Sequence, residues 1–183
     1  DAKEDLSIQL HPNDELAKER HNSFGKTEMW YVMQADESAR LVVGFKKDSN
    51  QEEYLSYLEN KNLVALLNES PVKKGDVFFL ETGTIHAIGA GVVVAEIQQT
   101  SDVTYRIYDW DRVDANGQGR ELHTELALDA INYNATDSKI TYKEEANQST
   151  LVVDCPYFIT NIIALQDRFI WKRKKQAFTV FMC

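Results

Sequence analysis

Leu6-Ser-Ile-Gln-Leu-His11 is the stretch from which the fold can be inferred, because apolar and polar side chains alternate along it. Alternate residues of a strand point to the same face of a sheet. The alternation therefore predicts a half-buried strand whose polar side chains, Ser7, Gln9 and His11, lie on one side. Pro12 ends this strand.

The same two-residue spacing of polar side chains occurs in two other short runs. These are Lys26-x-Glu28 and Asp102-x-Thr104-x-Arg106. A histidine, His86, lies in the turn-like run Gly83-Thr-Ile-His-Ala87 and can complete the set. If the runs are strands of one structure, their polar faces can converge although they lie far apart along the chain.

These polar residues are of the kinds that bind metals and anions. Two imidazoles, a carboxylate and an amide suit a divalent metal such as zinc, although zinc usually takes His, Cys or carboxylate rather than an amide. A lysine and an arginine nearby would suit a phosphorylated ligand, and in an acidic protein such local positive charge matters more. The pattern predicts a metal centre that binds an anionic small molecule.

Short strands separated by turns make up most of the chain. Strands are predicted at 6–11, 27–33, 39–45, 77–80, 92–98, 103–108, 139–143, 150–153, 158–165 and 178–182. A helix that Asn13 or Asp14 can cap is predicted at 14–20. Further helices are predicted at 124–132 and in an insertion at about 49–68 that is broken near 60–62. Turn signals every 8–12 residues or so favour a β-sandwich or barrel over a βαβ fold. The predicted class is all-β with a helical insertion.

The composition limits the partners and the compartment. A net charge of −9 over 183 residues argues against a nucleic-acid partner, which would need a basic stripe. No apolar run approaches the roughly 20 residues that span a bilayer, so no membrane partner is expected. The distant cysteines Cys155 and Cys183 fit a reducing, cytoplasmic setting. The basic run at 172–175 is expected to be a solvated loop.

Four motifs in this order resemble the successive motifs of type I phosphomannose isomerases, also called mannose-6-phosphate isomerases. They are Ser7-Ile-Gln-Leu-His-Pro12, Gly25-Lys-Thr-Glu-Met-Trp30, Gly83-Thr-Ile-His-Ala87 and Gln98-Gln-Thr-Ser-Asp-Val-Thr-Tyr-Arg106. The short insertion between Glu28 and His86 resembles the compact bacterial branch. The resemblance is strong over residues 1–133 and fainter beyond. It departs at Gly25, where long-form relatives have a histidine.

The resemblance implies a cupin (jelly-roll) β-barrel followed by the start of a second cupin-like β-domain. Residues 1–135 would form the metal-binding catalytic domain without its opening part. Residues 136–183 would begin the second, metal-free domain. The chain is expected to be an internal fragment of a longer protein, because strand-like runs lie at both of its ends. A monomer or weak homodimer is expected.

The resemblance also assigns roles to residues. It implies one Zn²⁺ per chain, held by Gln9, His11, Glu28 and His86. It places Arg106 in the catalytic cleft, and it gives Ser7 and Lys26 contacts with the substrate, to which Arg106 can add its own. Asp102 matches a position proposed to help proton transfer. The catalytic base stays open between Lys26, Asp102 and a metal-bound water.

The implied reaction interconverts mannose 6-phosphate and fructose 6-phosphate, and a proton moves between C2 and C1 through an enediolate. A metal and Arg106 would stabilise the developing negative charge or clamp phosphate. Lys26 offers a point charge for a phosphate of roughly −1.5 to −2. Two alternatives remain. One is an iron cupin oxygenase, which would use a three-histidine or facial-triad site. The other is a non-catalytic sugar-phosphate-binding cupin.

Overall fold

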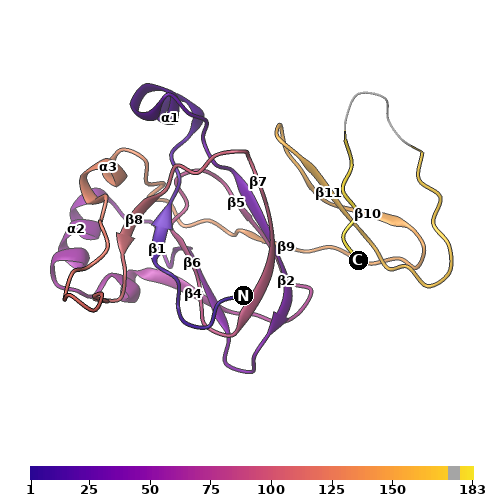
Figure 1. Cartoon of the computed structure of the whole chain (residues 1–183), viewed down its shortest axis with the longest axis horizontal. Helices are drawn as coiled ribbons and strands as arrows, with labels where there is room; N and C mark the ends of the chain where they lie inside the picture. The colour runs from indigo at the N-terminus through magenta and orange to yellow at the C-terminus, as the bar shows by residue number, and fades with distance from the viewer. Residues whose placement is uncertain (173–177) are drawn as a thin grey trace.

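The computed structural model describes residues 1–172 and 178–183, and it is built mainly from antiparallel strands (Figure 1). The strands are β1 (Ile8–Leu10), β2 (Glu28–Ala35), β3 (Arg40–Phe45), β4 (Leu67–Pro71), β5 (Val77–Leu80), β6 (His86–Ile88), β7 (Val92–Gln98), β8 (Tyr105–Tyr108), β9 (Lys139–Ile140), β10 (Ser149–Asp154) and β11 (Ile159–Ile163). The helices are α1 (Asp14–His21), α2 (Gln51–Glu59), α3 (Thr124–Leu128) and the 3₁₀ helix η1 (Leu63–Leu66).

Two sheets face each other and form a barrel. One has the strand order β4-β3-β6-β1-β8, and the other has the order β7-β2-β5-β9. Buried side chains from both sheets, among them Trp30, Leu41 and Phe78, pack into one cluster between the sheets. Side chains two residues apart on a strand point to the same face. Glu28, two residues before Trp30 on β2, therefore also faces the interior.

The outer face of the five-stranded sheet is covered by α2, η1 and α3 (Figure 1). Ile8 and Leu10 of β1 pack there with Tyr54 of α2 and Ala127 of α3. Apolar residues of β1 therefore face the helices, and the polar residues between them face the barrel. This is the arrangement that the alternation in β1 predicts.

The outer face of the four-stranded sheet packs against the hairpin formed by β10 and β11. Met29, Val77 and Val153 form the buried part of this contact. Strand β9 pairs with β5, whereas β10 and β11 pair only with each other among the named strands (Figure 1). Whether residues 136–183 begin a second cupin-like domain stays a prediction.

The predicted helical insertion is confirmed, with its break after Glu59, but its end is wrong. Residues 67 and 68, predicted as the end of the helix, belong instead to β4, because the backbone of β4 pairs with β3, as in Leu41 opposite Ser70. The apolar spacing continues through Leu67, so the pattern alone could not show this switch. Asn13 caps α1 as predicted, accepting a hydrogen bond from the Leu16 N–H at 2.9 Å.

Other predictions also differ from the structure. The strand predicted at 139–143 ends at Ile140, and His86, predicted in a turn-like run, begins β6 because it pairs with Gln9 and Val43. Helix α3 ends at Leu128 instead of near 132, because the Asn132 N–H donates to the carbonyl of Gly83 and leaves the helix. The run 178–182 is not a strand, and Phe178 is 89% exposed. Of the basic run at 172–175, residues 173–175 lie outside the described residues. No helix in the described ranges is long and apolar enough to cross a membrane.

Candidate metal centre

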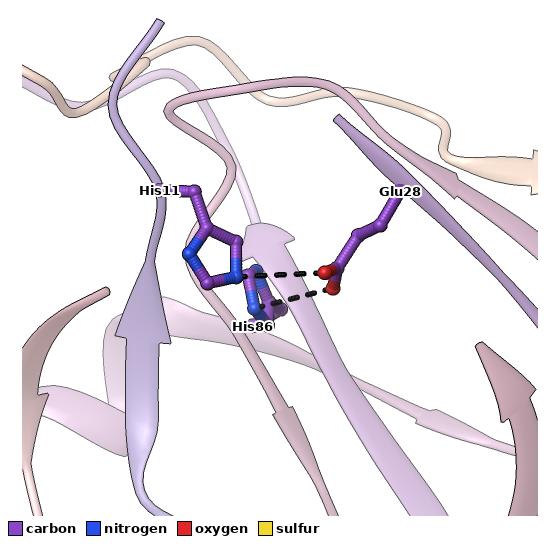
Figure 2. A group of neighbouring side chains, drawn as sticks. All are labelled: His11, Glu28 and His86. Carbon is purple, nitrogen blue, oxygen red and sulfur yellow. Dashed lines mark ion pairs between the residues drawn. The ribbon is translucent and has the colours of Figure 1, made fainter. Parts of the chain in front are cut away.

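Three buried side chains converge inside the barrel from three separate strands. His11 follows β1, Glu28 begins β2 and His86 begins β6. Their exposed fractions are 2%, 1% and 2%, and their ligand atoms all lie within 4.8 Å of one another. Figure 2 shows the three side chains pointing toward one another. This group could hold a metal ion.

Hydrogen bonds to the backbone set the tautomer of both histidines. His11 Nδ1 lies 2.8 Å from the carbonyl oxygen of Val103, and His86 Nδ1 lies 2.8 Å from that of Thr84. A carbonyl oxygen only accepts, so each Nδ1 must carry the proton. The neutral rings therefore direct the lone pair of Nε2 toward Glu28, as metal-ligating histidines usually do.

The facing atoms of the group are all hydrogen-bond acceptors. His11 Nε2 lies 3.5 Å from Glu28 Oε2, and His86 Nε2 lies 3.5 Å from Glu28 Oε1 (Figure 2). These four atoms are buried and have no hydrogen-bond partner among the described residues. Buried polar atoms without partners are costly. A dication would satisfy all four at once, so the donor set fits a metal.

The charge states at neutral pH suit metal binding. Burial by itself would raise the pKa of Glu28, but contact with His11 and charge from His86 and Lys26 outweigh burial and lower the pKa to about 2. Burial lowers the pKa of His86 to about 4, although the Glu28 carboxylate favours the charged ring. At pH 7 the group therefore offers an ionised carboxylate and a neutral imidazole of His86, which are the forms that bind metals.

A tight turn delivers His86 to the barrel. Gly83 has φ of +84°, and a Cβ there would lie 2.6 Å from the carbonyl oxygen of Ala130, so only glycine fits. The Gly83 N–H also donates to the carbonyl of His11 at 2.8 Å, which ties this turn to β1. The Trp30 ring lies edge-on to His86, with centroids 5.3 Å apart.

Gln9 lies next to this group by register. It pairs with His86 of β6 on one side and with Arg106 of β8 on the other. Paired residues of antiparallel strands place their side chains on the same face. Gln9 therefore shares the interior face with His86 and Arg106, and its role as a metal ligand stays a prediction.

Arg106 and Ser7 contact each other on this interior face. The Arg106 Nε donates to Ser7 Oγ at 3.3 Å, and one terminal nitrogen donates to the carbonyl of Glu121 at 2.9 Å. Burial and the neighbouring Arg120 lower the pKa of Arg106, and a guanidinium still keeps its charge in proteins. The structure thus brings together two of the predicted substrate-binding residues.

Lys26 lies against the metal group, and it has a second carboxylate partner that sequence reasoning missed. The ammonium is 3.4 Å from Glu28 Oε2 and 3.7 Å from Glu96 Oε1, and the lysine side chain is 11% exposed. Glu96 also accepts a hydrogen bond from Trp30 Nε1 at 3.0 Å. In the sequence, the one indication for Glu96 was that it is a charged residue within the otherwise apolar run 92–97. Its pairing opposite Trp30 is visible only in the structure.

Asp102 is the predicted site residue that the described contacts do not join to the group. It is exposed and precedes β8, and its backbone carbonyl accepts a hydrogen bond from the Thr104 hydroxyl at 3.3 Å. Its role in proton transfer stays a prediction.

An antiparallel barrel with a buried group of two histidines and a carboxylate defines a protein of the cupin type, and comparison with known proteins agrees. Mannose-6-phosphate isomerase ManA of Bacillus subtilis is 40% identical over 162 residues, covering 86% of this chain and 51% of the relative. The mannose-6-phosphate isomerase of Streptococcus mutans is also 40% identical over 162 residues, covering 86% of this chain and 50% of that protein.

A solved structure of an enzyme with the same name is also similar to this chain. The crystal structure of the mannose 6-phosphate isomerase from Bacillus subtilis aligns with a TM-score of 0.79 at 37% identity, covering 87% of this chain and 52% of that one. No protein-family model matches the chain. The resemblance carried by the four motifs and the cupin fold class are therefore confirmed. The chain spans about half the length of the curated relatives it matches.

Proposed function

We propose that this chain carries the catalytic metal centre of a zinc-dependent mannose-6-phosphate isomerase. The observation that carries the proposal is the buried His11–Glu28–His86 group, whose four facing atoms have no partner among the described residues. The relatives that match 86% of the chain bear the name of this enzyme. Arg106 and Lys26, beside the same group, are cations suited to a sugar phosphate.

The three ligands, with Gln9 as the proposed fourth, suit one Zn²⁺ per chain. Glu28 supplies the single negative charge among them, so a bound dication keeps net positive charge. When bound, the metal supplies Lewis-acid polarisation of the sugar oxygens. The Nδ1 bonds of His11 and His86 hold the rings in place for this ion, as second-sphere hydrogen bonds do in other metal sites.

Arg106 and Lys26 are proposed to bind the substrate, to stabilise the charge that develops on it and to assist proton transfer. Arg106 is held by Ser7 and Glu121, and its planar fork can stabilise the negative charge of the enediolate or clamp phosphate. Ser7 orients this guanidinium and contacts substrate. Lys26 binds phosphate or carries the proton, and Asp102 is the other candidate for proton transfer. In the reaction a proton leaves C2, passes to the base and returns to C1.

The test measures conversion of mannose 6-phosphate to fructose 6-phosphate by the purified full-length protein, together with its metal content. We expect about one zinc per chain, loss of activity after treatment with a chelator, and recovery when Zn²⁺ is added back. Oxygen uptake is measured in the same samples, and none is expected. A protein that retains full activity after complete metal removal would falsify the proposal.

The donor set itself supports one alternative. Two histidines and one carboxylate also form the facial triad of iron oxygenases. Iron in the purified protein with substrate-dependent oxygen uptake would favour that function. Binding of mannose 6-phosphate without turnover would favour a non-catalytic sugar-phosphate-binding cupin. A cytoplasmic location and a monomer or weak homodimer stay predictions.

A further inference from the structure

The segment that carries Lys26 is held by a group of hydrogen bonds outside the metal centre. The Gly25 N–H donates to Asp14 Oδ1 at 2.8 Å, and the Thr27 N–H donates to Gln99 Oε1 at 2.7 Å. The Gln99 N–H returns a bond to the Thr27 carbonyl at 3.0 Å. The backbone is thus fixed on both sides of Lys26 by two side chains that sequence reasoning did not single out.

Asp14 and Gln99 are also bound to each other. Gln99 Nε2 donates to Asp14 Oδ1 at 3.1 Å, and Gln99 is 8% exposed. Asp14 begins α1, three residues after His11, so the pair connects the two chain segments that carry His11 and Glu28. The approach is close, because a Cβ at Gly25 would lie 2.7 Å from the Asp14 backbone nitrogen.

The second oxygen of Asp14 is bound by the C-terminal hairpin. The Tyr157 hydroxyl, in the turn between β10 and β11, donates to Asp14 Oδ2 at 2.6 Å. Tyr157 and Thr27 also line one cavity of about 230 Å³ between the hairpin and the barrel. The carboxylate of Asp14 therefore has three hydrogen-bond donors, which come from the Lys26 segment, from the residue after β7 and from the hairpin.

We propose that Asp14 and Gln99 are positioning residues for Lys26, and that Tyr157 completes them, so that the hairpin contributes to substrate binding without touching the substrate. The proposal rests on the proposed function, because it takes Lys26 as a substrate contact. A lysine side chain is flexible, and holding the peptides on both sides of it limits where its ammonium can reach. A displaced ammonium binds the sugar phosphate less tightly in the ground state and the transition state alike, so its displacement raises KM rather than lowering kcat.

Two conservative variants, at Gln99 and at Tyr157, test whether the hydrogen bonds of these side chains to Asp14 position Lys26. Gln99→Glu keeps the acceptor for the Thr27 N–H but replaces the donor to Asp14 by a second carboxylate oxygen. Tyr157→Phe removes one hydroxyl on a side chain that is 47% exposed. Tyr142→Phe is the matched control, because its hydroxyl donates to the Gly75 carbonyl at 2.6 Å, away from the Lys26 segment.

In the zinc-loaded full-length protein, Gln99→Glu should raise the KM for mannose 6-phosphate about tenfold, as loss of supporting contacts does in other sites, with kcat changed less than about threefold. Tyr157→Phe should raise the KM by about threefold, and Tyr142→Phe should leave it unchanged. In a Lys26→Met background, Gln99→Glu should add less than a twofold further effect, since residues that act through one group are not additive. Multiplicative effects of Lys26→Met and Gln99→Glu would show a merely structural role and overturn the proposal.

Amide hydrogen exchange gives a readout that does not depend on activity. Exchange at Gly25, whose N–H donates to Asp14, should be several-fold faster in Gln99→Glu and Tyr157→Phe than in Tyr142→Phe. Unchanged exchange in both variants would also overturn the proposal. If the wild-type protein does not isomerise the sugar phosphate, the proposed function fails, and the exchange rates alone then decide whether the pair holds the Lys26 segment.

Discussion

His11 Nε2 and Glu28 Oε2 lie 3.5 Å apart, although neither atom can donate a hydrogen bond to the other. The Val103 carbonyl holds the proton of His11 on Nδ1, and the lowered pKa of Glu28 keeps its carboxylate ionised at pH 7. The same relationship holds between His86 Nε2 and the other oxygen of Glu28. Lone pairs that face one another in a buried site repel, and a cation between them removes that repulsion. The folded chain therefore favours binding of a cation between these atoms.

Replacing His86 by alanine should remove metal and activity together, because one of three converging ligands is lost. Elemental analysis should show the zinc content falling well below one per chain. The exposed His21 provides the control, and His21→Ala should keep full metal content. Unchanged zinc stoichiometry in His86→Ala would remove this residue from the site.

Glu28→Gln should separate metal binding from stability. The amide can donate to a histidine Nε2, so the metal-free variant should be at least as stable as the metal-free wild type. Zinc at 100 times its Kd should stabilise the wild type by about 2.7 kcal/mol, seen as a rise in Tm, and should stabilise the variant much less. Equal zinc-induced shifts in both proteins would contradict the assignment of Glu28 as a ligand.

Arg106→Ala should leave zinc bound and lower turnover by on the order of 10²- to 10³-fold, by analogy with loss of one oxyanion donor. The guanidinium bonds to Ser7 and Glu121 rather than to the histidines, so the metal group stays intact. The measurements are kcat and zinc content on the same preparation. Near-normal turnover would refute the catalytic role of Arg106.

The stability of the metal-free protein should fall as the pH drops from about 6.5 to about 4. The pKa of His86 is about 4 in the folded chain and 6.5 without burial, so the unfolded state binds a proton in this window that the folded state does not. The loss between pH 7 and pH 5 should be about 2 kcal/mol. Urea unfolding in chelator should show it, and His86→Gln should show a smaller loss. Glu28, with its pKa lowered to about 2, adds a further loss below about pH 4.5.

Tyr54→Phe should stabilise the protein by about 1 kcal/mol. The Tyr54 hydroxyl is buried under α2 and has no hydrogen-bond partner among the residues that the structure describes, and burial raises the pKa of this phenol. Removing the hydroxyl removes the cost of burying it without a partner. Tyr133→Phe is the comparison, because its hydroxyl donates to the Leu128 carbonyl at 3.3 Å and its loss should destabilise. Chemical denaturation measures both. A Tyr54→Phe variant less stable than the wild type would contradict the reasoning.

Elements with strong local signals could be predicted, and those set by distant partners could not. The alternation in β1 and the Asn13 cap of α1 are readable because they depend on neighbours in sequence. Strand β4 was missed because its backbone pairs with β3, far along the chain. The apolar run at 178–182 has a strand-like composition but finds no strand partner in the described part of the chain, so composition alone was not sufficient.

For the candidate site, too, some features could be predicted from the sequence and others only from the tertiary structure. Two-residue spacing singled out His11, Glu28 and Arg106, because alternation decides which side chains share a face of a strand, and the turn-like run 83–87 singled out His86. Only the tertiary structure decided that the Nε2 atoms of both histidines face the same carboxylate, that Glu96 joins Lys26, and that Asp14 and Gln99 hold the Lys26 segment. These contacts join residues up to 85 positions apart, and their geometry depends on how the two sheets close into a barrel, which no local pattern encodes.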